Sequence, residues 1–69
     1  MIDEVVLNKT QIIKRCLTRV REVYAGNPAR LNDYTKQDSI ILNIQRACET
    51  CIDLAMHVVA EKDLGRPAE

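Results

Sequence analysis

The sequence has no phenylalanine, no tryptophan and only two tyrosines, two glycines and two prolines among its 69 residues. It therefore lacks the aromatic platforms on which many proteins stack single-stranded bases. A charge excess of one sign is also missing, because ten basic and ten acidic side chains cancel. With 46% apolar and 29% charged residues, the composition is nevertheless typical of a globular chain and not of a disordered one.

Long apolar runs are missing as well. The best stretch, residues 54–60, is far shorter than the roughly 20 residues that span a bilayer. The N-terminal Met-Ile-Asp-Glu is acidic where a secretory signal is basic. Three cysteines are too few, and odd in number, for a disulfide framework. We therefore expect a cytoplasmic protein that does not contact membranes.

Apolar residues recur at helical spacing in two segments. The stripe of the first segment consists of Val6, Thr10, Ile13, Leu17, Val20 and Tyr24. The stripe of the second consists of Ile41, Ile44, Cys48, Cys51, Ala55 and Val58. Gly26 and Pro28 are expected to end the first helix, and Thr35 with Asp38 resembles a capping box that begins the second. The run L-G-R-P at 64–67 is a stop signal for the second helix.

These patterns predict an all-α fold in a single domain over residues 1–69. It is an antiparallel hairpin of two long helices, at about 3–25 and 36–64, joined by a loop at about 26–34. Each apolar face is wider than one partner helix covers. We therefore expect a homodimer that forms a four-helix bundle, or packing of the hairpin within a longer helical domain.

Charge is unevenly divided along the chain. Residues 1–32 hold six basic and three acidic side chains, net +3, and residues 33–69 hold four and seven, net −3. Between Lys9 and Arg21 there are five basic residues and no acid. This segment, with Lys14, Arg15 and Arg19, is either a phosphate-binding surface for RNA or a basic helix lying against an acidic one.

The cysteines and the single histidine suggest a zinc site, but helical geometry argues against it. Cys48 and Cys51 lie mid-helix on the apolar stripe, and His57 projects about 120° away from Cys51 on a helical wheel. We therefore expect the cysteines to be core residues and expect no metal. The chain also has no P-loop and no glycine-rich dinucleotide turn, so we expect no cofactor.

A polar stripe runs along the other side of the second helix. It comprises Asn43, Arg46, Thr50, Asp53 and His57, with Leu42, Glu49 and Met56 on a neighbouring stripe. An Arg, an Asp and a His on one surface can hold a phosphate and transfer a proton. The alternatives are burial against another helix or a solvated face with an ion pair between its own residues.

Residues 33–59, with the sequence DYTKQDSIILNIQRACETCIDLAMHVV, resemble the N-terminal half of HepT-like proteins of the HEPN superfamily. The segment IIKRCL at 12–17, the run R-E-x-Y at 21–24 and L-G-x-P at 64–67 fit the same family. The resemblance covers nearly the whole chain. It implies the first half of an all-α HEPN domain that dimerises and acts as an RNA-cleaving toxin, without a metal, in a toxin–antitoxin system.

The resemblance also implies a partner, a minimal nucleotidyltransferase antitoxin. The family's catalytic signature, Arg followed after four to six residues by His, does not occur in residues 1–69, so we expect no catalytic residue and no intrinsic activity in this chain. Asn43, Arg46 and Glu49 are the candidates to line the cleft or the dimer interface. A non-enzymatic interaction or dimerisation module is the alternative to a truncated toxin.

Overall fold

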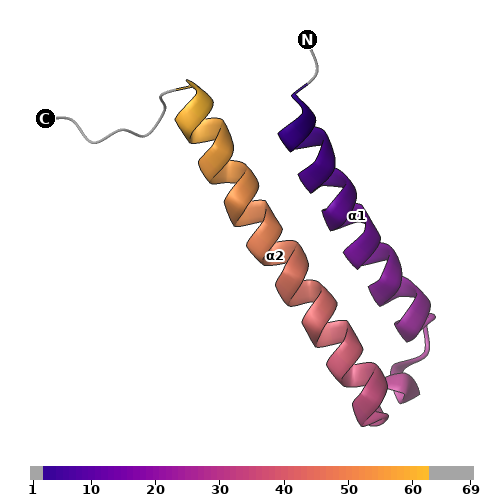
Figure 1. The fold of residues 1–69 in the computed structure, drawn as a ribbon. Coiled ribbons are helices and arrows are strands. Elements are labelled where there is room, and N and C mark those ends of the chain that lie inside the picture. Colours follow the sequence, from indigo (N-terminus) through magenta and orange to yellow (C-terminus); the bar gives the residue numbers. More distant parts are fainter. Residues whose placement is uncertain (1–2, 63–69) are drawn as a thin grey trace, which may run out of the picture.

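The computed structural model describes residues 3–62 and contains two long helices and one short one. Helix α1 spans Glu4–Tyr24, the 3₁₀ helix η1 spans Pro28–Asn32, and α2 spans Tyr34–Lys62. Figure 1 shows α1 and α2 side by side and antiparallel, with η1 in the connection at one end. No strand occurs within the described residues. The expected all-α hairpin of two long helices is confirmed.

Side-chain and backbone caps define both ends of α1. Oδ1 of Asp3 accepts hydrogen bonds from the backbone N–H groups of Val5 and Val6, which have no partner inside the helix. At the other end Ala25 adopts a left-handed conformation, with φ 51°, and its N–H donates to the carbonyl of Arg21 at 2.7 Å. The helix was expected to be ended by Gly26, but the left-handed residue that ends it is Ala25, one position earlier.

Helix α2 begins differently from the prediction. Its cap is Asp33, whose Oδ1 accepts from the N–H groups of Thr35 and Lys36 at 2.9 and 3.2 Å. The expected capping box of Thr35 and Asp38 is wrong, because an acid two residues earlier already satisfies the first free N–H groups. The expected stop signal at 64–67 lies outside the described residues.

The contact between the helices is narrow. Among the described residues, only Cys16 of α1 and Ile40 and Ala47 of α2 are buried. The α2 side that faces α1 consists of Ile40, Asn43, Ala47, Thr50, Leu54 and His57, all buried or half-buried. Part of the polar stripe is thus packed against the other helix, one of the alternatives that the sequence left open.

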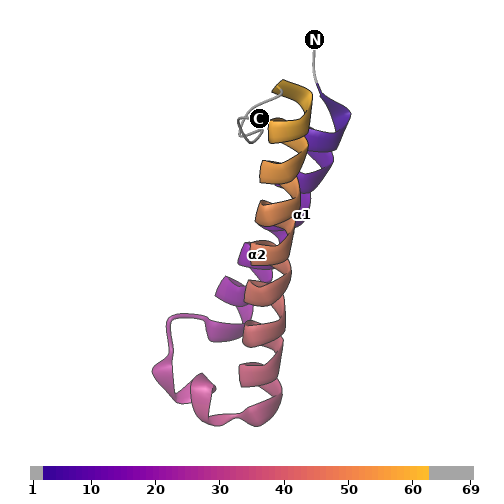
Figure 2. The same ribbon diagram turned by 90° about the vertical axis from the view of Figure 1, so that its left-hand side faces the viewer.

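A broad apolar surface of α2 is left uncovered. We define the apolar face as Ile41, Ile44, Cys48, Cys51, Ile52, Ala55, Val58 and Val59, all of them exposed. The view of Figure 2, turned by 90° from Figure 1, shows α2 lying along α1, with the connection and η1 beside one end of it only. Neither α1 nor α2 has a stretch apolar enough to cross a lipid bilayer.

Candidate functional site

A hollow lies between α1 and α2 near the middle of the hairpin. We call it the groove and define it by Ile12, Arg15, Cys16 and Arg19 of α1 and Asn43 and Arg46 of α2. Its volume is about 410 Å³. The helices bring together side chains that lie far apart in the sequence. Two of the three candidate RNA-contacting residues thus meet two of the three candidate cleft residues at one place.

The charge of the groove is positive and largely unpaired. Within residues 3–62, neither Arg15 nor Arg46 forms an ion pair. Arg19 lies 3.9 Å from Glu22, but both side chains are 62% exposed, and such surface pairs contribute little. Three arginine side chains therefore line one hollow without a buried acid among the described residues to neutralise them.

The alternative of a basic helix neutralised by an acidic one receives little support. The only ion pair between a lysine or arginine of α1 and an acid of α2 is that of Lys9 with Asp53, at 3.8 Å, within the described part of the chain. The basic side chains nearer the middle of α1 have no such partner on α2. They are free to meet an external anion.

Asn43 adds a polar, uncharged side to the groove. Its side-chain amide donates to the carbonyl of Ser39 at 2.8 Å, one helical turn earlier. This bond fixes the side chain, so that its oxygen remains available as an acceptor. Glu49 is exposed and does not line the groove, so the structure separates it from Asn43 and Arg46.

Further basic residues extend the positive surface on both sides. Lys14 shares an adjoining hollow with Arg15 and Asn8, on α1. Towards the connection, Arg30 and Lys36 line another hollow that also contains Arg19. Sequence reasoning missed these last two, because Arg30 belongs to the connection and Lys36 to a segment with net negative charge.

Local contacts hold this second extension in place. A guanidinium nitrogen of Arg30 donates to the carbonyl of Val23 at 3.4 Å, near the end of α1. Nζ of Lys36 lies 3.1 Å from Asp33, and this hydrogen bond lowers the pKa of the Asp33 carboxyl. The connection is therefore tied to both helices beside the groove.

The polar stripe of α2 does not form a single catalytic cluster. Arg46 lines the groove, Asp53 pairs with Lys9, and His57 lies 2.8 Å from Asp3. The alternative of a solvated face with an ion pair between residues of this stripe is not observed in the described chain. An Arg–Asp–His site for proton transfer is thus not assembled within residues 3–62.

The cysteines also differ from expectation. Cys16 is buried against α2, but Cys48 and Cys51 are exposed, so the expectation that these two are core residues is wrong for the described chain. The cause is that α1 packs on the neighbouring side of α2, where Ala47 and Thr50 permit a close approach. Both exposed thiols belong to the apolar face.

Comparisons with known proteins agree with this architecture. The family model described as "Ribonuclease HepT-like" matches residues 13–69. The chain is 44% identical over 66 residues to the mRNA nuclease HepT of Shewanella oneidensis, covering 96% of this chain and 50% of that protein. It also matches a crystal structure of the mutant toxin–antitoxin MntA–HepT with a TM-score of 0.86 and 43% identity, covering 97% of this chain and 52% of the other.

The described residues thus form an all-α hairpin with a basic groove and an uncovered apolar face. The chain belongs to the HepT-like ribonuclease family. It spans about half the length of the relatives that it matches.

Proposed function

We propose that this chain supplies an RNA-binding surface of a HepT-like toxin, and that the groove contacts the phosphates of the RNA. The observation that carries the proposal is the meeting of Arg15, Arg19 and Arg46 in one hollow without a buried acid. Arginine is suited to phosphate, because its planar donors bind two oxygens at once. The relative from Shewanella oneidensis is described as an mRNA nuclease, which supports RNA as the ligand.

The role of the groove in this proposal is to hold the RNA backbone and not to perform the chemistry. No Arg followed after four to six residues by His occurs in residues 1–69. We place the catalytic Arg and His of the family in the half of the domain that this chain does not match. There, a 2′-hydroxyl would attack the adjacent phosphate, with His as acid or base. By itself the chain is proposed to bind RNA without cleaving it.

The apolar face is proposed to be the assembly surface. Ile41, Ile44 and Ile52 are 56%, 45% and 60% exposed, which is a large apolar surface for a hairpin with three buried residues among those described. A second copy of the chain, completing a four-helix bundle, would cover it. A nucleotidyltransferase antitoxin is the proposed further partner, since the matching crystal structure is of the toxin–antitoxin MntA–HepT. The toxin is proposed to act in the cytoplasm, where its RNA targets lie.

A purely structural interaction module is the second candidate, and the exposed apolar face is the observation that favours it. Such a module would bind a helical protein partner through this face and would leave RNA untouched. The two candidates differ in whether the groove has a ligand of its own.

Fluorescence anisotropy with a labelled single-stranded RNA distinguishes the two candidates. The double substitution R15E/R19E reverses two charges in the groove, and R21E/K62E reverses two charges elsewhere on the same helices. The RNA-binding proposal predicts that the first variant loses most of its affinity and the second retains it. Equal affinities in both variants, or no binding by the unmodified chain, would leave the interaction module. Cleavage of the RNA by the 69-residue chain would refute the assignment of catalysis to the other half.

A further inference from the structure

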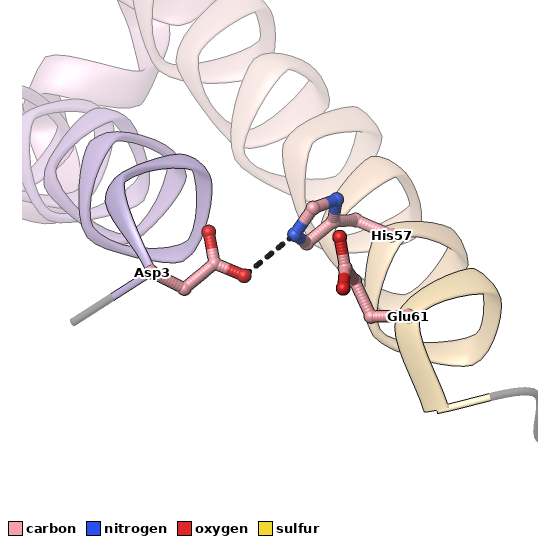
Figure 3. Close-up of side chains that lie close together, drawn as sticks. All are labelled: Asp3, His57 and Glu61. Carbon is pink, nitrogen blue, oxygen red and sulfur yellow. Dashed lines mark hydrogen bonds and ion pairs between the residues drawn. The ribbon is translucent and has the colours of Figure 1, made fainter. Parts of the chain in front are cut away.

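A second cluster of polar side chains lies at the open end of the hairpin, far from the connection. Figure 3 shows Asp3, from the start of α1, pointing towards His57 and Glu61 of α2. Nε2 of His57 lies 2.8 Å from Oδ2 of Asp3. One donor atom from each of the three side chains lies within 4.8 Å of the other two. The proposed RNA function uses none of these residues.

The geometry of the cluster follows from the helices. His57 and Glu61 are four residues apart in α2, so their side chains lie on the same side, one turn from each other. Asp3 is fixed from the other helix, because its Oδ1 accepts two backbone hydrogen bonds as the cap of α1. This leaves Oδ2 directed at His57. Two elements thus bring three ligand atoms to within 4.8 Å of one another, and rotation of these side chains would bring them onto one ion.

The charges of the cluster are unbalanced. Two carboxylates lie near one imidazole, which carries at most a single positive charge. Within residues 3–62, neither Asp3 nor Glu61 forms an ion pair with a lysine or arginine. A cation that meets all three side chains would therefore offset a local excess of negative charge.

We propose that Asp3, His57 and Glu61 form a binding site for a divalent transition-metal ion of the zinc class. An imidazole nitrogen and carboxylate oxygens are ligands that Zn²⁺ accepts at about 2.0–2.2 Å, with water completing the shell. Mg²⁺ and Ca²⁺ prefer oxygen ligands alone, so the imidazole favours the transition metal. The bound ion replaces the hydrogen bond between Asp3 and His57 and is ligated by both helices.

The site has a structural consequence. The helices are joined by the chain at one end only, and the ion would connect them at the other. Binding to the folded hairpin alone raises its stability by mass action. The ion stabilises the pairing of the two helices and takes no part in the RNA chemistry. This proposal is therefore independent of the proposed function.

His57 is the single histidine of the chain, which makes its ring protons an unambiguous NMR probe. The experiment titrates Zn²⁺ into untagged, metal-free protein carrying C48S/C51S, because two exposed thiols one turn apart bind zinc themselves. The proposal predicts a saturable shift of the His57 ring resonances and a rise in Tm. E61Q and D3N each weaken the binding at least about tenfold. Mg²⁺ leaves the ring resonances unchanged.

E49Q, in the same background, is the matched control, since Glu49 is an exposed acid on α2 outside the cluster. It is expected to bind Zn²⁺ like its parent. The absence of any zinc-dependent shift at His57 would overturn the proposal. A shift of equal affinity in E61Q and D3N would also overturn it, because the imidazole alone would then account for the binding. Circular dichroism of each variant, without metal, verifies that the hairpin is retained.

Discussion

The two sides of the hairpin expose different kinds of side chain to water. On the groove side, Arg15 and Arg46 are charged groups without an ion-pair partner in the described chain, and water solvates them at little cost. On the apolar face, Ile41 and Ile52 are more than half exposed, and the contact of these apolar side chains with water is unfavourable. The first surface suits a ligand that binds reversibly, such as a polyanion. The second suits a partner that forms a stable complex.

The separation of these surfaces follows from helix geometry. Arg46 flanks the α1-facing side of α2 on one edge, next to Asn43, and Ile44 and Cys48 flank it on the other. Substitutions on one surface are therefore expected to leave the other intact, as long as the narrow contact between the helices survives.

The largest expected effect concerns that contact. Ala47 is 6% exposed, and A47E would bury a charge without a partner, at a cost of about 3 kcal/mol or more. A hairpin with so small a core is expected to lose its helical circular dichroism signal. A55E introduces the same side chain on the apolar face and is expected to retain the signal. Equal loss in both variants would mean that the contact at Ala47 and the apolar face do not differ in their importance for folding.

The next effect concerns assembly. I44E removes an isoleucine from the apolar face, and the lost burial of about 1.5–3 kcal/mol corresponds to a roughly tenfold to hundredfold weaker association. Analytical ultracentrifugation measures this directly. L42E, which replaces an exposed leucine of α2 outside the apolar face, is the control. It is expected to associate like the unmodified chain. If L42E associated more weakly than I44E, the assembly surface would lie on the Leu42 side of α2.

A smaller effect is expected in the groove. R46Q removes one charged phosphate contact, which is expected to weaken RNA binding by about 1.5 kcal/mol, or roughly tenfold. R21Q makes the same change at a residue that does not line the groove and is expected to bind RNA nearly as well as the unmodified chain. Anisotropy titrations at one salt concentration compare the pair. Similar losses in both would indicate that overall charge, and not the groove, attracts the RNA.

The smallest effect is a dependence on pH at the open end of the hairpin. The hydrogen bond with His57 lowers the pKa of Asp3. Because the folded pKa is lower than the unfolded value of about 4, Asp3 favours folding above that pH and loses this contribution as the pH falls through its folded pKa. D3N keeps the cap, since Asn caps helices as well as Asp does, but removes the charge.

Thermal melts of metal-free protein are therefore expected to show a lower Tm for D3N than for the unmodified chain at neutral pH. The difference is expected to shrink below about pH 4. E49Q, which removes an exposed carboxylate without a hydrogen bond in the described chain, is expected to show no such dependence. A constant difference between D3N and the unmodified chain at all pH values would contradict the role of the Asp3 charge.

The helices were predictable because their apolar residues recur every three or four positions, and the acid at the start of α1 is visible in the sequence. Which side of α2 meets α1 was not predictable from hydropathy. The most apolar side, with Ile44 and Cys51, is exposed, and the contact uses the smaller side chains Ala47 and Thr50. Hydropathy identifies the surface that must be buried somewhere, whereas small side chains decide where two helices approach closely.

The candidate site was partly predictable for a similar reason. A run of basic residues without an acid identified Arg15 and Arg19, and the family resemblance pointed to Asn43 and Arg46. Only the packing of the helices shows that these four share one groove. The partnership of Asp3 with His57 spans 54 positions in the sequence and had no local signal.

The salt dependence of RNA binding tests the central claim, that the groove arginines contact phosphates, most directly. Each phosphate contact on a single strand contributes a slope of about −0.7 to log K against log salt concentration, so three arginines predict about −2. R15E/R19E is expected to flatten the slope by about 1.4, and R21E/K62E to leave it nearly unchanged. Slopes that change equally in the two variants, or in neither, would contradict the claim.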